Sequence, residues 1–94
     1  MRPEEIIEKK FVTQCKEELN IDAWKFEIKN KKGPPDRIMF LKRATTIFIE
    51  FKRPNGGELS EHQIKFINNL RNLGFKVLVT DSVEEAMNFV KEHL

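Results

Sequence analysis

The sequence has little of what stabilises an extracellular protein or anchors a membrane protein. It contains a single cysteine, Cys15, so no disulfide can form within the chain, and a reducing compartment is expected. No apolar run approaches the roughly 18 residues of a membrane-spanning helix, and the first residues lack the apolar core of a signal peptide. These absences predict a soluble intracellular protein, cytoplasmic if its source is a bacterium or a phage.

The chain also lacks internal repeats, long linkers and low-complexity segments. Residues 1–94 therefore predict one domain, and a chain of this length buries only a modest hydrophobic core. Because association is a common way for short chains to bury more apolar surface, we expect a homodimer.

Charge is nearly balanced overall, with 17 basic and 15 acidic side chains, but it is unevenly distributed. Residues 25–53 carry nine basic and three acidic side chains, a net charge of +6, whereas residues 81–94 carry a net charge of −3. A basic zone favours a polyphosphate partner, although such a run is also compatible with ordinary solvated surface. The candidate phosphate contacts are Lys29, Lys31, Lys32, Arg37, Lys42, Arg43 and Arg53.

Apolar periodicity predicts an α/β fold with the element order α-β-β-β-α-β-α. A first helix is expected from about Pro3 to Glu18, and two more helices begin at Ser60 and Ser82, where a capping-box partner follows three residues later. Strands are expected over residues 24–28, 37–41, 46–51 and 75–80, with Trp24 in the core. The last strand is apolar almost throughout, which predicts burial on both faces and parallel pairing with the third strand.

Two short segments carry the strongest chemical signal. A Gly33-Pro34-Pro35-Asp36 turn precedes the second strand, and Ile49-Glu50-Phe51-Lys52 closes the third. Antiparallel pairing of these strands brings Asp36 beside Glu50, and alternation places Glu50 and Lys52 on one face. Two carboxylates are ligands that Mg²⁺ accepts. The alternatives are a turn residue after proline at Asp36 and an outward charge on an edge strand at Glu50.

Three other side chains are candidates for the same site. Lys52 can orient the attacking water or neutralise charge on a phosphate, or it can simply pair with Glu50 or face solvent. Glu8 lies at the margin of the first helix's apolar stripe, where it can reach the sheet. Its rivals are Glu4, one turn earlier on the same face, and Glu5. Gln63 has the position of a capping-box partner, but it also leads the buried stripe of its helix.

Asp36 and Glu50-Phe51-Lys52, preceded by Gly33-Pro34-Pro35 and followed by Gln63, resemble the PD-(D/E)xK nuclease superfamily and specifically its VRR-NUC branch. Glu8 and the segments 59–63, 70–75 and 81–85 extend the resemblance over nearly the whole chain. Pro34 occupies the variable position x of the usual Gly-x-Pro-Asp pattern, where many residues are accepted and a proline stiffens the turn.

The resemblance implies a restriction-endonuclease-like mixed sheet flanked by helices. It implies Mg²⁺ or Mn²⁺, in one or two sites, bound by Asp36, Glu50, Glu8 and the carbonyl of Phe51. It also implies that Lys52 is catalytic and that Gln63 assists the metal site or a phosphate.

The sequence therefore predicts a deoxyribonuclease that hydrolyses phosphodiester bonds. The resemblance implies structure-specific cleavage, with branched DNA such as a four-way junction as the substrate. A nicking or restriction-type nuclease acting on simpler DNA is the first alternative. A catalytically silent DNA-binding scaffold is the second, although the intact set of Asp36, Glu50 and Lys52 argues against it.

Overall fold

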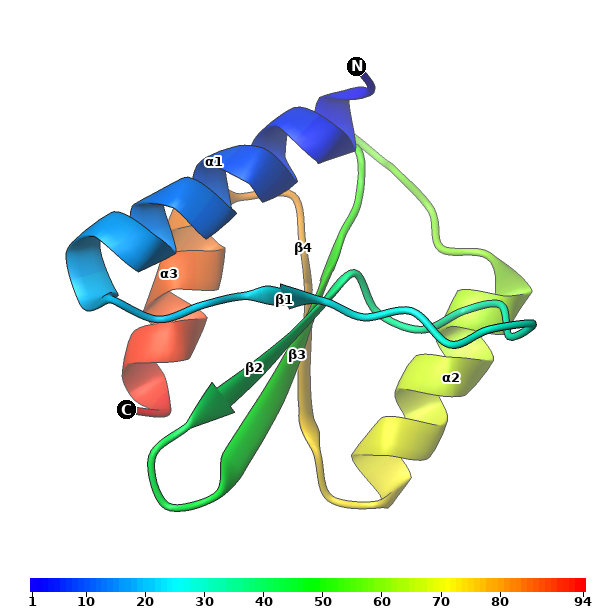
Figure 1. The fold of residues 1–94 in the computed structure, drawn as a ribbon. Coiled ribbons are helices and arrows are strands. Elements are labelled where there is room, and N and C mark those ends of the chain that lie inside the picture. Colours follow the sequence, from blue (N-terminus) through cyan, green and yellow to red (C-terminus); the bar gives the residue numbers. More distant parts are fainter.

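The computed structural model describes residues 1–94 as three helices around a four-stranded mixed sheet (Figure 1). The elements are α1 (Pro3–Leu19), β1 (Trp24–Lys25), β2 (Arg37–Leu41), β3 (Thr45–Phe51), α2 (Glu61–Asn72), β4 (Lys76–Thr80) and α3 (Val83–Glu92). The predicted element order is thereby confirmed. None of the helices is both long enough and apolar enough to cross a membrane.

The sheet has the strand order β1-β2-β3-β4. β2 pairs antiparallel with β3, so that Arg37, the first residue of β2, lies opposite Ile49 near the end of β3. The hairpin closes at Arg43 and Ala44, which both have left-handed backbone conformations, with φ of 60° and 56°. β3 and β4 are parallel neighbours, as predicted, with α2 between them in the chain. This register brings the segment before β2 to the carboxyl end of β3.

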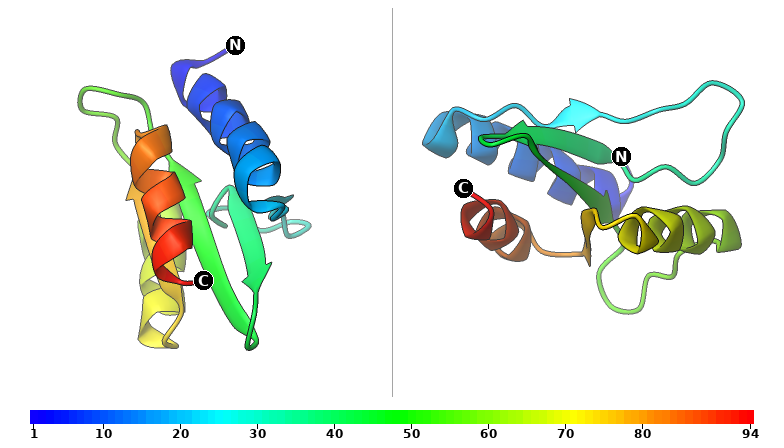
Figure 2. Two further views of the ribbon diagram at one scale, coloured as in Figure 1. Left: turned by 90° about the vertical axis from the view of Figure 1, so that its left-hand side faces the viewer. Right: turned by 90° about the horizontal axis from the view of Figure 1, so that it is seen from below.

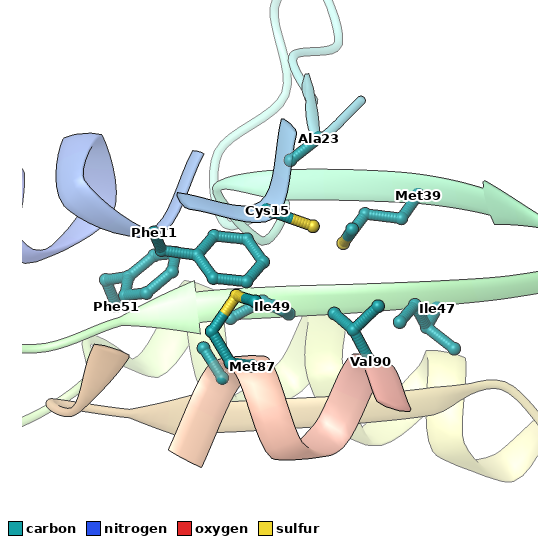
Figure 3. Close-up of a cluster of buried hydrophobic side chains, with 10 residues drawn as sticks. Phe11, Cys15, Ala23, Met39, Ile47, Ile49, Phe51, Met87 and Val90 are labelled. Atoms are coloured by element: carbon teal, nitrogen blue, oxygen red, sulfur yellow. The ribbon is translucent and has the colours of Figure 1, made fainter. Parts of the chain in front are cut away.

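Helices cover both faces of the sheet: α1 and α3 lie on one side and α2 on the other (Figure 2). Alternate residues of β3 point to the first side, where Ile47, Ile49 and Phe51 join the larger core. The rings of Phe51 and Phe11 have centroids 5.6 Å apart, which ties α1 to the end of β3 (Figure 3). A smaller cluster around Phe48 lies beneath α2. Because side chains of β3 pack into both cores, the position of the end of this strand is fixed.

The first strand is shorter than predicted. β1 ends at Lys25, and the chain then turns, with the amide of Lys31 donating to the carbonyl of Ile28 and with Asn30 in the left-handed region. The prediction that Trp24 lies in the core is wrong, because its strand is at the sheet edge and the residue is 57% exposed. The prediction that the last strand is buried on both faces is also wrong, because β4 is the opposite edge strand and Leu78 and Val79 are only half-buried.

The loop between β1 and β2 packs against the beginning of α2. Gly33 has a φ of +102°, and a Cβ atom there would overlap the carbonyl oxygen of His62 in the first turn of α2. The ring of Phe26 also meets that of Phe66, edge to face, with centroids 6.1 Å apart. Glycine is therefore required at position 33 for this loop to reach the helix.

Candidate active site

A polar hollow of about 270 Å³ lies at the carboxyl end of β3. Its wall is formed by the first turns of α1, the start of β2, the end of β3 and the segment leading into α2. Six carboxylates line it, against three basic side chains. The carboxylates belong to Glu4, Glu5, Glu8, Asp36, Glu50 and Glu58. An excess of negative charge in a partly enclosed hollow attracts cations.

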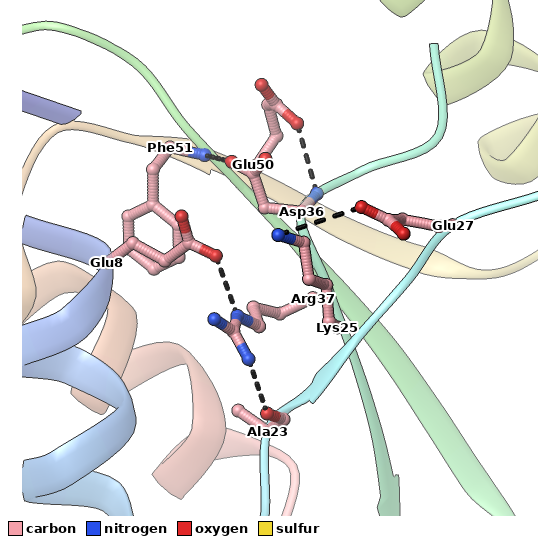
Figure 4. Close-up of polar contacts among 8 residues, drawn as sticks. All are labelled: Glu8, Ala23, Lys25, Glu27, Asp36, Arg37, Glu50 and Phe51. Carbon is pink, nitrogen blue, oxygen red and sulfur yellow. Dashed lines mark hydrogen bonds and ion pairs between the residues drawn. The ribbon is translucent and has the colours of Figure 1, made fainter. Parts of the chain in front are cut away.

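Hydrogen bonds from backbone amides hold the carboxyl groups of Asp36 and Glu50 side by side. The amide of Asp36 donates to Glu50 Oε1 at 3.1 Å, and the amide of Phe51 donates to Asp36 Oδ2 at 2.8 Å (Figure 4). Glu50 is only 3% exposed. The antiparallel pairing predicted from the sequence thus brings these carboxyl groups together in a fixed orientation.

Burial of these carboxyl groups disfavours their charged forms. The pKa of Glu50 is raised to about 8, mainly by burial and secondly by the negative charge of Asp36. Burial also raises the pKa of Asp36, although the hydrogen bond from the Phe51 amide opposes this shift. The charge of Glu8 on α1 raises both pKa values further. A buried and a half-buried carboxyl group so close together cannot both ionise easily until a cation lies between them.

This pKa shift makes the stability of the metal-free protein depend on pH. The pKa of Glu50 is higher in the folded chain than its ordinary value of 4.5, so its contribution to stability is complete below pH 4.5 and is lost as pH rises toward about 8. We therefore expect the Tm in EDTA to fall between pH 5 and pH 8, measured by thermal unfolding, and Glu50→Gln to reduce that fall. An equal fall in the two proteins would contradict the shift.

Gln63 connects α2 to this carboxylate pair. Its Nε2 donates to Glu50 Oε2 at 2.8 Å, while its Oε1 accepts from the amide of Ser60 at 2.8 Å. Ser60 Oγ in turn accepts from the amide of Gln63 at 3.2 Å, which completes the predicted capping box. The sequence offered a helix cap and a site residue as alternative interpretations, and the geometry permits both at once.

Lys52 lines the hollow one residue beyond β3. Its backbone amide donates to the carbonyl of Thr80 at 2.9 Å, which continues the pairing between β3 and β4. Its ammonium forms no ion pair with any carboxylate of the chain, so the simple pairing with Glu50 is not formed. A half-buried cationic group is therefore available to an anion that enters the hollow.

Glu8 and Arg37 form a partly buried ion pair across the wall of the site. Arg37 Nε lies 2.7 Å from Glu8 Oε2, and Arg37 Nη1 donates to the carbonyl of Ala23 at 3.0 Å (Figure 4). The two side chains are only 18% and 16% exposed. The structure thus places Glu8 at the hollow and directs the Arg37 guanidinium, a predicted phosphate contact, into the protein.

Glu4 also faces the hollow. Its Oε1 lies 3.3 Å from Arg2 Nε, whereas its Oε2 is buried without a hydrogen-bond partner. An unpartnered buried carboxylate oxygen is uncommon and costly unless water or an ion satisfies it. The structure therefore brings both Glu4 and Glu8 to the site. Sequence reasoning missed Arg2 and Glu58, whose only signal was proximity to predicted site residues along the chain.

The predicted basic residues separate into two groups. Arg53 lines the hollow itself, while Lys29 and Lys31 line an adjoining hollow that also includes Asp36. Lys42 and Arg43 lie in the β2–β3 turn, at the opposite end of the two strands.

The donor chemistry of the hollow fits a divalent cation. No three His, Cys, Asp or Glu side chains converge into a preformed centre. Mg²⁺ commonly takes only one or two carboxylates and keeps several waters, so the Asp36–Glu50 pair is sufficient. The raised pKa of Glu50 and the unpartnered oxygen of Glu4 are both features that a bound cation would relieve.

Comparison with known proteins identifies related nuclease domains. The VRR-NUC domain family matches residues 4–84. The relative named Putative nuclease p44, from Acyrthosiphon pisum secondary endosymbiont phage 1, is 35% identical over 79 residues, which cover 84% of this chain and 83% of that protein. A solved structure described as a VRR-NUC domain matches over 100% of both chains, with a TM-score of 0.82 and 21% identity. The structural match confirms the mixed α/β fold.

Proposed function

This chain belongs to the VRR-NUC family of nuclease domains, and from this premise we propose that it is a divalent-metal-dependent DNA endonuclease. The observation that carries the proposal is the pairing of the buried Glu50 with the half-buried Asp36, fixed by hydrogen bonds from the amides of Asp36 and Phe51, beside the unpaired ammonium of Lys52. Such a pair is costly to bury without a cation. A cation bound there for phosphodiester hydrolysis would offset that cost.

In this proposal Asp36, Glu50 and the carbonyl oxygen of Phe51 hold Mg²⁺ or Mn²⁺. Glu8, or Glu4 beside it, adds a carboxylate directly or through water. When bound, the ion polarises the scissile phosphate and lowers the pKa of its bound water.

The other polar residues act around this pair. Lys52 orients the attacking water and neutralises the charge that develops on the phosphate. Gln63 holds Glu50 Oε2 through its amide and so keeps the carboxylate aimed at the site. Arg37 positions Glu8 through their ion pair. Lys29, Lys31, Lys32 and Arg53 bind DNA phosphates without reading sequence.

We further propose that the protein is a homodimer that cuts branched DNA, with a four-way junction as the leading substrate. The chain forms one hydrolytic hollow, and a single hollow cuts one strand per encounter. Two-fold symmetry supplies a second site that matches the pseudo-symmetry of a junction, and two-fold dimers are the commonest homo-oligomers.

Cleavage of labelled linear, flapped and four-way DNA tests this proposal. We expect cleavage with Mg²⁺ or Mn²⁺, fastest on the junction, and little with EDTA or Ca²⁺, because the longer and looser coordination of Ca²⁺ misplaces the water. Equal rates on all three substrates would favour the nicking or restriction-type alternative. No cleavage under any condition would favour the silent scaffold.

Light scattering tests the dimer separately. An 11.1 kDa monomer at micromolar concentration, with and without DNA, would contradict the dimer while leaving the nuclease assignment unaffected.

A further inference from the structure

Two additional hollows continue the surface away from the catalytic hollow. The first lies along residues 25–36 and shares Asp36 with the catalytic hollow. The second lies between that loop and α2 and shares Lys31 with the first. Because each hollow shares a lining residue with the next, the three are neighbours on the surface. We call the surface formed by Lys29, Lys31, Lys32, His62, Lys65 and Asn69 the basic track.

The charge of the basic track is opposite to that of the catalytic hollow. The hollow against α2 is lined by Lys31, Lys32 and Lys65 and by no acidic side chain. None of these lysines, nor Lys29, forms an ion pair within the chain. A carboxylate-rich cation site that leads into unpaired lysines suits a polyanion that places one phosphate at the cation and its next phosphates on the lysines.

The basic track joins two segments that are distant in the sequence and is held by packing. The close approach of Gly33 to the His62 carbonyl brings the loop onto the first turn of α2. The contact between Phe26 and Phe66 fixes the same junction from the sheet side. Lys31 is therefore kept near Lys65 by two independent contacts, so the charges form a built surface.

We propose that the DNA strand carrying the scissile phosphate leaves the catalytic hollow over residues 26–34 and follows α2 from His62 to Asn69. Lys31, Lys32 and Lys65 bind successive phosphates, and His62 and Asn69 add hydrogen bonds. This inference rests on the proposed nuclease function and adds the direction in which the DNA strand leaves the catalytic hollow. The substrate needs a strand that extends a few nucleotides, about four, on one side of the cut.

A double variant, Lys31→Ala with Lys65→Ala, tests the basic track. Its matched control is Lys10→Ala with Lys91→Ala, which removes two exposed lysines from α1 and from α3. Binding of a labelled four-way junction is measured by fluorescence anisotropy in EDTA over a range of salt concentrations, and cleavage is measured in Mg²⁺. Each lost phosphate contact reduces the slope of log K against log salt by about 0.9.

We expect the double variant to lose about 1.8 from that slope and to raise KM roughly tenfold with little change in kcat, whereas the control matches the wild type. A substrate whose cleaved strand ends close to the cut, on the side that would contact α2, should give similar KM values for the wild type and the double variant. If the double variant cleaves normally and its slope of log K against log salt equals that of the wild type, the basic track does not bind DNA, and the nuclease proposal is unaffected. Failure of the wild type to bind or cut DNA would overturn both proposals, and KM values that do not converge would overturn the direction.

Discussion

Glu50→Gln is expected to lower the rate of DNA cleavage by about a hundredfold or more in Mg²⁺, measured under single-turnover conditions. The substitution keeps the shape of the side chain and an oxygen for the hydrogen bond from the Asp36 amide, but it removes the charge that would hold the cation. Glu50 is buried near the end of β3, so its carboxylate is held in one position relative to Asp36.

The matched control for this variant is Glu84→Gln, an exposed residue in the first turn of α3 that does not line the catalytic hollow. It should cleave at the wild-type rate. Circular dichroism should show that both variants remain folded. A Glu50→Gln protein that cuts as fast as the wild type would exclude Glu50 from the metal site.

Lys52→Ala is the second variant for which a large loss is expected, on the order of a hundredfold in cleavage rate. Its ammonium has no ion-pair partner within the chain, so its removal leaves no orphaned carboxylate and should cost little stability. Single-turnover cleavage at saturating DNA separates this loss of chemistry from any loss of binding.

Lys76→Ala, at the exposed beginning of β4, removes the same charge from another part of the surface and should leave the rate unchanged. Equal losses in the two variants would mean that Lys52 acts only through the overall charge of the protein.

The proximity of Asp36 to Glu50 at the centre of the candidate site could be predicted from the sequence, because it depends on local periodicity. Alternation along β3 places Glu50 and Lys52 on one face, and a three-residue hairpin turn fixes which end of β2 meets the end of β3. The resulting proximity of Asp36 to Glu50 follows from these local rules alone. The capping box that places Gln63 was also readable from residue spacing.

Features that depend on packing between distant elements could not be predicted in this way. The ion pair of Arg37 with Glu8 joins residues 29 positions apart, and it directs a predicted phosphate contact into the protein. Trp24 has the alternating pattern of a half-buried strand, but the pattern does not reveal that its strand is a two-residue edge. The approach of Lys65 to Lys31 depends on how the loop around Gly33 packs on α2.

The choice between Glu4 and Glu8 shows the same limit of sequence reasoning. One helical turn separates the two residues, and helix periodicity alone gives both a similar direction. In the structure both line the hollow, but Glu8 is held by Arg37 while one oxygen of Glu4 lacks a partner.

The central claim is that the Asp36–Glu50 pair binds the divalent cation on which cleavage depends. Its most direct test is the single-turnover cleavage rate of one labelled DNA substrate as a function of Mg²⁺ concentration, measured for the wild type and for Asp36→Asn. We predict saturable activation of the wild type, no product in EDTA, and at least about a hundredfold slower cleavage by the variant at every Mg²⁺ concentration. Undiminished cleavage in EDTA, or a variant that follows the wild-type curve, would contradict the claim.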